Sequence, residues 1–153
     1  LPKLTFDMYG EGGQRQVLTD LIAEKQATEY IKLKGHHELE QIYPQYEAYI
    51  TASTSEGFGL TLMEAVGAGL AMIGLDVRYG NQTFIAAGKN GYLLEMSAKK
   101  DQQLLVDKLA QSIIQLFTVE NLAQAHEASY EVARKYLTSE IEQKWVKLLG
   151  GIK

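Results

Sequence analysis

Two carboxylates and two glycines lie close together in SEGFGLTLMEAVGAG, residues 55–69. An ionised carboxylate accepts hydrogen bonds and cannot donate them, so Glu56 and Glu64 suit neighbouring hydroxyl groups rather than a phosphate. Gly57 and Gly59 allow positive φ and the close approach of a ligand to bare backbone. A helix that begins just after them has N–H groups without intrahelical partners, which favour an anion such as phosphate. A phosphate with hydroxyl-bearing groups on both sides describes a nucleotide sugar.

The elements that must position these residues alternate along the chain. Strands are predicted at residues 4–10, 30–35, 48–53, 71–75 and 92–96, the last after a tight, hairpin-like Asn90-Gly91 turn. Helices are predicted at 61–68, 101–117, 119–136 and 138–149, at 39–46 where Pro44 interrupts a short one, and around Val17, Leu18, Leu21 and Ile22.

Short apolar strands separated by helices indicate crossover connections and a parallel sheet covered on both faces. The predicted fold class is therefore α/β, a doubly wound, mostly parallel sheet with helices on both faces and a helical C-terminal part. We expect residues 1–153 to form a single domain. Ligands of such sheets bind beyond the carboxyl ends of the strands, which selects the loops at residues 10–14, 35–38, 53–59 and 76–81. Glu56 precedes the helix after the third loop and Glu64 lies about one turn inside it, so both can face one crevice.

Composition excludes several classes of protein. The chain has 153 residues, a net charge of −4 and no cysteine. A nucleic-acid-binding module normally carries a basic stripe, and a disulfide framework or a cysteine-rich zinc site needs cysteine. No apolar run approaches the roughly twenty residues of a membrane-crossing helix. We expect a cytoplasmic protein without nucleic-acid partners or a transmembrane segment, one that could also work at the inner face of the membrane.

The segment EGFGLTLME resembles the E-x7-E signature of retaining glycosyltransferases of group 1 (family 4), in the C-terminal, donor-binding domain of the GT-B fold. The resemblance extends over residues 4–94 and includes the GEG turn, TASTSEGFGLTLMEAVGAG and GKNGYLL. The variant GLDVRYGNQTFI is similar to Gram-positive enzymes of surface polymers. These are the poly(glycerol phosphate) glucosyltransferases and the accessory-Sec enzymes that put N-acetylglucosamine on adhesins.

The resemblance implies roles for individual residues. Glu56 would contact hydroxyls of the donor sugar, and Glu64 would contact the ribose hydroxyls of the nucleotide. The residues whose backbone would lie against the sugar and the diphosphate are Gly57, Phe58, Gly59, Leu60 and Thr61. No cofactor or metal is implied, since the nucleotide sugar is a substrate.

Three further residues border the cleft in this interpretation. Gly10 and Gly12 open a turn after the first strand, and His36 follows the second, where the family often touches the base. Arg15 occupies the place of the third glycine of a dinucleotide fingerprint, so a nicotinamide site is disfavoured.

The chain also departs from the family pattern. Its first strand, LTFDMYG, resembles the family's second, so the preceding strand with its arginine and lysine and the N-terminal domain are expected to be missing. By resemblance, the complete enzyme transfers a sugar from a nucleotide sugar, UDP-N-acetylglucosamine or UDP-glucose, to a hydroxyl with retention of configuration. We expect this fragment to fold but not to catalyse sugar transfer.

Two alternatives remain open. One is a non-catalytic, glycosyltransferase-like subunit that binds a partner, and a glycosyltransferase-like partner subunit is also conceivable for an active enzyme. The other is a nucleotide-sugar 2-epimerase, which shares the two-domain architecture and needs no acceptor.

Overall fold

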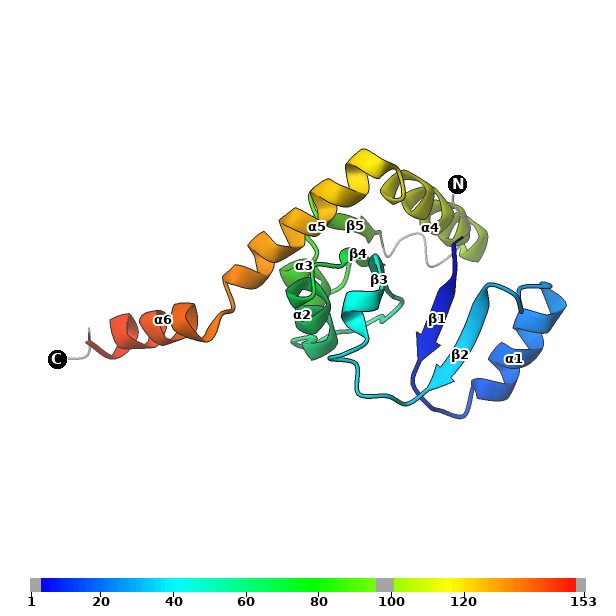
Figure 1. The fold of residues 1–153 in the computed structure, drawn as a ribbon, viewed down its shortest axis with the longest axis horizontal. Coiled ribbons are helices and arrows are strands. Elements are labelled where there is room, and N and C mark those ends of the chain that lie inside the picture. The colour runs from blue at the N-terminus through cyan, green and yellow to red at the C-terminus, as the bar shows by residue number, and fades with distance from the viewer. Residues whose placement is uncertain (1–3, 96–100, 151–153) are drawn as a thin grey trace. The chain divides into compact units, whose positions relative to one another are not determined.

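The computed structural model describes residues 4–95 and 101–150, and its helices and strands are drawn in Figure 1. Its contacts cluster into two compact units, Leu1–Leu39 and Glu40–Lys153. Each unit is described by itself, and the single-domain organisation stays a prediction.

Unit 1 consists of a parallel strand pair and one helix. Strand β1 (Phe6–Tyr9) and strand β2 (Ile31–Gly35) are joined through helix α1 (Arg15–Glu24), which contacts β2. The register runs from Phe6 opposite Ile31 to Tyr9 opposite Gly35. The predicted strands and helix are confirmed, with β1 shorter than the expected 4–10.

Unit 2 contains a three-stranded parallel sheet in the order β3-β4-β5. Its strands are β3 (Ala48–Thr51), β4 (Ala71–Leu75) and β5 (Gly91–Leu94). Its helices are η1 (Tyr43–Gln45), α2 (Leu60–Gly67), α3 (Gly80–Phe84), α4 (Gln102–Leu116), α5 (Val119–Arg134) and α6 (Thr138–Gly150). Parallel strands joined by helices, followed by helices at the C-terminal end, confirm the predicted α/β fold class.

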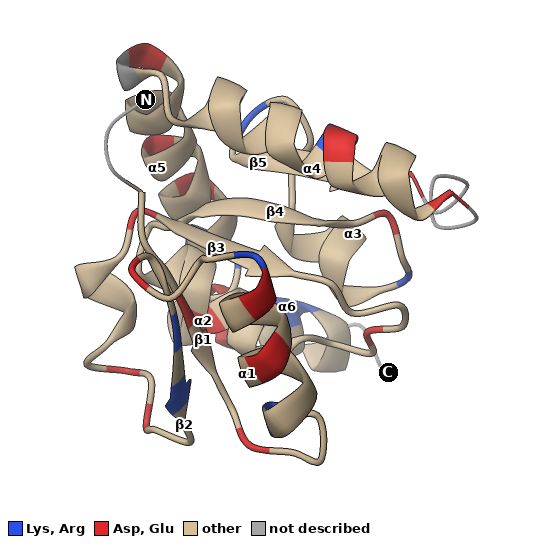
Figure 2. Cartoon of the chain, turned by 90° about the vertical axis from the view of Figure 1, so that its right-hand side faces the viewer, with Lys and Arg blue, Asp and Glu red and all other residues tan. Residues whose placement is uncertain are grey.

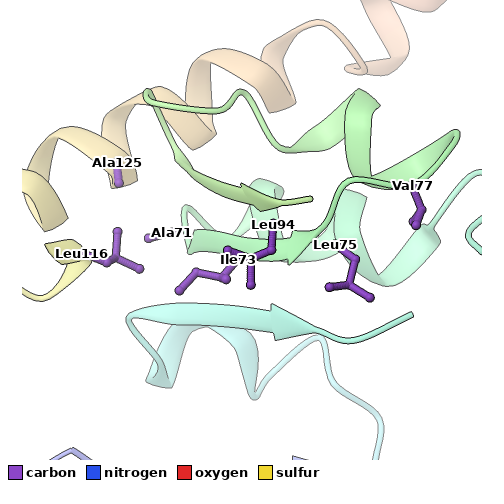
Figure 3. Close-up of a cluster of buried hydrophobic side chains, with 7 residues drawn as sticks. All are labelled: Ala71, Ile73, Leu75, Val77, Leu94, Leu116 and Ala125. Carbon is purple, nitrogen blue, oxygen red and sulfur yellow. The ribbon is translucent and has the colours of Figure 1, made fainter. Parts of the chain in front are cut away.

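The core of unit 2 is built around β4, all five residues of which are buried. A strand can be buried throughout only if both faces of its sheet are covered. Ile73 and Leu75 belong to a cluster with residues of β5, α4 and α5 (Figure 3). On the other face, a Cβ at Gly74 would lie 2.8 Å from Ile85 Cδ1, just after α3. Residues of α4 and α5 therefore cover one face of β4, and Ile85 covers the other.

Two predicted elements differ from the structure. The helix expected at 39–46 is only the 3₁₀ turn η1, in which Pro44 occupies the first turn and offers no N–H to an α-helical ladder. The predicted loop at 76–81 already contains the beginning of α3, which sequence analysis missed. With five residues, α3 is too short to show a helical period.

The turn before β5 is not that of a hairpin, since β5 runs parallel to β4. Its left-handed residue is Gly88, with φ +75°. The buried Asn90 amide donates to the Phe84 carbonyl at 2.9 Å and accepts from the Ala86 N–H at 2.7 Å. A Cβ at Gly91 would overlap the Met72 carbonyl oxygen, so close strand pairing requires glycine there. The predicted end of this strand at Met96 lies outside the described residues.

The C-terminal helices match the predicted boundaries within two residues, and α6 carries no buried side chain. Among the helices in the described part of the chain, none is both long and apolar enough for a bilayer crossing.

Candidate functional site

The loop between β3 and α2 holds the sequence motif. Gly59 caps α2 in a left-handed conformation, φ +83° and ψ 66°, and the helix begins at Leu60, one residue earlier than predicted. Positive φ is therefore confirmed for Gly59, whereas Gly57 is not among the glycines in that region. A residue with a Cβ would be strained at position 59, so the sharp turn into α2 depends on glycine.

Main-chain hydrogen bonds tie Glu56 to the turn after β4. The Glu56 N–H donates to the Arg78 carbonyl at 3.4 Å, and the Glu56 carbonyl accepts from the N–H groups of Tyr79 and Gly80, the latter at 3.1 Å. The turn itself is braced by Asn81 Nδ2, which donates to the Leu75 carbonyl at 2.8 Å. The backbone of Glu56 is thus held by a neighbouring loop of the same sheet edge.

Two glycines confine the side chain of Glu56. A Cβ at Gly59 would lie 3.3 Å from Glu56 Cγ, and a Cβ at Gly80 would lie 2.7 Å from the same atom and 2.6 Å from the Phe58 carbonyl oxygen. Glu56 is half-buried at this point. Its methylene stem passes between two backbone surfaces, which leaves the carboxylate as the part that can meet a ligand.

The N-terminus of α2 offers main-chain donors. Gly59 supplies no side-chain cap, and the first turn of α2 contains no acidic residue. Among the described residues, the N–H groups of Leu60 and Thr61 have no recorded hydrogen-bond acceptor. These amides carry the positive end of the helix dipole, which suits a phosphate.

Lysine and arginine side chains do not gather into a positively charged patch in the described part of unit 2. Their positions are spread over several elements of the described chain rather than along one (Figure 2). Arg78, in the turn beside Glu56, is exposed. The partial positive charge beside the loop that is held in place by the backbone is therefore that of the N–H groups at the start of α2.

Glu64 lies in α2 and has a specific partner. The hydroxyl of Tyr43, in η1, donates to Glu64 Oε2 at 3.1 Å. Tyr43 is only 5% exposed. Burial raises the pKa of Tyr43, and the neighbouring Glu64 carboxylate raises it further, so the phenol stays protonated and remains a donor.

A second tyrosine contacts the first turn of α2. Tyr49 Oη donates to Thr61 Oγ1 at 3.1 Å, and its ring lies 6.2 Å from that of Tyr43. The oxygen of the Thr61 hydroxyl thus accepts from Tyr49, so the O–H and the main-chain N–H of Thr61 are both left as donors for a ligand.

The ring of Phe58 packs against two other aromatic side chains. It packs edge-on against Phe84 at 5.3 Å and against Tyr136 at 6.4 Å, measured between ring centroids. Phe58 is nevertheless 50% exposed, and the contact of its backbone with a ligand stays a prediction.

The remaining predicted residues belong to unit 1. Gly10 and Gly12 line a cavity of about 250 Å³, together with Arg15 and other residues of β1, α1 and β2. Arg15 is engaged there, since its guanidinium contacts Glu11 Oε1 at 3.2 Å. His36 is exposed after β2. The role of these residues at the edge of a cleft stays a prediction.

Sequence reasoning missed Tyr43 and Gly80. Tyr43 lies 21 residues before Glu64 in a segment without a helical or strand period, so no local pattern indicated the contact. Gly80 belongs to the loop at 76–81, which was predicted to border the ligand because it follows β4. No sequence pattern predicted that Gly80 packs against Glu56.

A parallel α/β fold with one glutamate before a glycine-capped helix and another inside it matches the C-terminal domains of GT-B glycosyltransferases. The family described as glycosyl transferases group 1 matches residues 1–130, and the chain belongs to this family. The resemblances expected from EGFGLTLME and GLDVRYGNQTFI are confirmed.

Relatives include a UDP-N-acetylglucosamine–peptide N-acetylglucosaminyltransferase GtfA subunit from Streptococcus pneumoniae serotype 4, which is 54% identical over 99% of this chain. The poly(glycerol-phosphate) alpha-glucosyltransferase of Bacillus subtilis is 30% identical over 98% of the chain. The chain spans 30% of the first relative and 22% of the second.

A solved structure similar to the chain is that of the pneumococcal O-GlcNAc transferase GtfA in complex with UDP and GlcNAc. It superimposes with a TM-score of 0.89 at 53% identity, covering 97% of this chain and 29% of that one.

Proposed function

We propose that this chain is the donor-binding half of a retaining glycosyltransferase that uses UDP-N-acetylglucosamine and transfers the sugar to a hydroxyl. The observation that carries the proposal is the Gly59-capped start of α2 with Glu56 before it and Glu64 within it. Free helix amides suit a diphosphate, and a carboxylate on either side suits two sets of hydroxyls. The sugar is proposed from the relative solved with UDP and GlcNAc, and UDP-glucose is the second donor to test.

Each group has a distinct role in this proposal. Glu64 accepts hydrogen bonds from the ribose, and Glu56 accepts them from hydroxyls of the transferred sugar. The backbone of residues 57–61 lies along the sugar and the diphosphate. As the bond to the diphosphate breaks, negative charge grows on the leaving group, and preoriented amides stabilise it without reorganising.

A binding titration of the full-length protein tests these roles. UDP, UDP-glucose and UDP-N-acetylglucosamine are titrated calorimetrically into the wild type, Glu56→Gln and Glu64→Ala, with Glu131→Gln on the exposed face of α5 as control. Glu64→Ala should weaken all three ligands, since all contain ribose. Glu56→Gln should weaken only the two nucleotide sugars, because UDP has no sugar for it to hold.

The magnitude follows from the charged hydrogen bonds involved. Removing one costs about 1.5–3 kcal/mol, or roughly 10- to 100-fold in affinity. Absence of uridine-nucleotide binding to the wild type would refute the donor site. Equal effects of both substitutions on UDP would refute the division of roles between the two glutamates.

We also propose that the active protein requires further parts, an N-terminal domain for the acceptor and a glycosyltransferase-like partner subunit. One support is that this chain covers only 30% of the length of its pneumococcal relative. The other is its similarity to a chain in the structure of the GtfA/B complex, with a TM-score of 0.83 at 52% identity. Product analysis separates the alternatives: a free epimerised sugar identifies an epimerase, and no turnover with unchanged partner binding identifies a scaffold.

A further inference from the structure

We propose that Tyr43 is a positioning residue that sets the preference of this site for ribose over deoxyribose, acting through Glu64. This inference rests on the proposed function, since it assigns a selectivity to the same nucleotide site. It concerns a side chain that neither the motif nor the family resemblance singled out.

The geometry isolates one contact. Tyr43 Oη donates to Glu64 Oε2 at 3.1 Å, and this is the one hydrogen bond recorded for the Glu64 side chain in the described part of the protein. Tyr43 is nearly fully buried, whereas Glu64 is exposed on α2. The buried partner therefore fixes an otherwise mobile carboxylate at the surface where a nucleotide would arrive.

The ring of Tyr43 is itself held in place. Pro44 follows it in η1 and restricts the backbone on either side of the peptide bond. Tyr49 lies against the ring at 6.2 Å between centroids and is anchored in turn by Thr61. The hydroxyl thus approaches α2 from a fixed direction.

A carboxylate held by one oxygen still accepts through the other. A carboxylate has about four lone-pair sites on its two oxygens, so the contact with Tyr43 leaves room for the hydroxyls of a ribose. A long exposed glutamate must otherwise give up rotamer freedom when it binds, which weakens affinity. Because Tyr43 has already ordered Glu64, a ribose hydroxyl meets an oriented acceptor. A deoxyribose that lacks this hydroxyl gains nothing from the orientation.

The test compares nucleotides that differ by a single hydroxyl. UDP and its 2′-deoxy and 3′-deoxy analogues are titrated into the full-length wild type, Tyr43→Phe, Glu64→Ala and the double variant. Phenylalanine keeps the shape of the buried ring and removes only the donor. Tyr130→Phe is the matched control, because its hydroxyl donates at 3.2 Å to the Ala68 carbonyl just after α2 and not to the Glu64 side chain. Thermal denaturation checks that each variant folds.

We expect Tyr43→Phe to weaken UDP by about 2- to 10-fold, since Glu64 must then be ordered when the ligand binds. The deoxy analogue that lacks the hydroxyl bound by Glu64 should be almost unaffected. In the Glu64→Ala background, the same substitution should have no further effect on UDP. Tyr130→Phe should leave the ratio of UDP to deoxy-UDP affinity at the wild-type value.

The outcomes separate the two hypotheses. If the wild type binds no uridine nucleotide, or if Glu64→Ala leaves the ribose preference intact, the proposed role of Glu64 is wrong. If Glu64→Ala abolishes the preference but Tyr43→Phe retains it, or lowers all three nucleotides equally, the role of Tyr43 is wrong. If Tyr43 were purely structural, Tyr43→Phe would weaken UDP binding in the Glu64→Ala background by the same factor as in the wild type.

Discussion

The substitution Gly80→Ala tests whether backbone packing positions Glu56. A methyl group at position 80 would lie 2.7 Å from Glu56 Cγ and 2.6 Å from the Phe58 carbonyl oxygen. Close-packed atoms do not tolerate such distances, so these atoms must move by about 0.7–0.8 Å before the contacts become ordinary. The atom that moves most easily is Glu56 Cγ, because the carbonyl belongs to the main chain.

The expected cost follows from this geometry. Inserting a methyl group into a packed site costs about 1–3 kcal/mol. In the proposed site, displacing the Glu56 carboxylate also removes a charged hydrogen bond to the donor sugar, and we expect this loss to lower affinity by roughly 10- to 100-fold. We therefore expect Gly80→Ala to bind UDP-N-acetylglucosamine no better than UDP, while UDP keeps its wild-type affinity.

The assay pairs calorimetric titration of both ligands with thermal denaturation. Gly67→Ala is the control, since a Cβ at that exposed position of α2 meets nothing within 4 Å. It should bind both ligands like the wild type, with a stability gain of up to about 1 kcal/mol from alanine in a helix. A Gly80→Ala variant with wild-type affinity for UDP-N-acetylglucosamine would refute the steric reasoning. So would an equal loss for UDP, which would indicate general damage to the loop.

Two further substitutions test the framework behind the site by urea denaturation. Gly91→Ala should unfold the β4–β5 pairing, because its methyl group would overlap the Met72 carbonyl oxygen; a midpoint equal to that of the wild type would contradict the close pairing. Asn90→Ala should destabilise unit 2 by about 2–4 kcal/mol, because it leaves the buried Phe84 carbonyl and Ala86 N–H without their partner, and a loss below about 0.5 kcal/mol would show that these groups find other partners.

The strands and long helices were predictable because each carries its signal locally. The run Ala71–Leu75 is apolar throughout and is buried throughout, and α4 and α5 are long enough to show a helical period. The boundaries of α3 and η1 were not predictable in the same way. Each is a single short turn, and its conformation is decided by contacts with other segments rather than by periodicity.

The site also contains features with a local sequence signal and features without one. The motif indicated positive φ at Gly57 or Gly59, because a left-handed position favours glycine, and the structure has it at Gly59. The confinement of Glu56 by Gly80 and the support of Glu64 by Tyr43 join segments more than twenty residues apart. The contact of Glu56 with Gly80 depends on the register of β3 against β4, and that of Glu64 with Tyr43 on the packing of α2 against η1, neither of which the sequence encodes in a short pattern.

The two carboxylates are held by different physical means, and this difference has a consequence for selectivity. Glu56 is fixed by main-chain hydrogen bonds and by the absence of a Cβ at Gly59 and Gly80, so polar side-chain substitutions nearby have little to remove. Glu64 depends on the single hydroxyl of Tyr43, which one substitution deletes without altering the fold. Because an oriented acceptor discriminates ligands by their hydroxyls, selectivity at Glu64 is adjustable through one neighbouring side chain. In the proposed site, selectivity at Glu56 changes when the carboxylate itself is replaced or when the loop backbone moves.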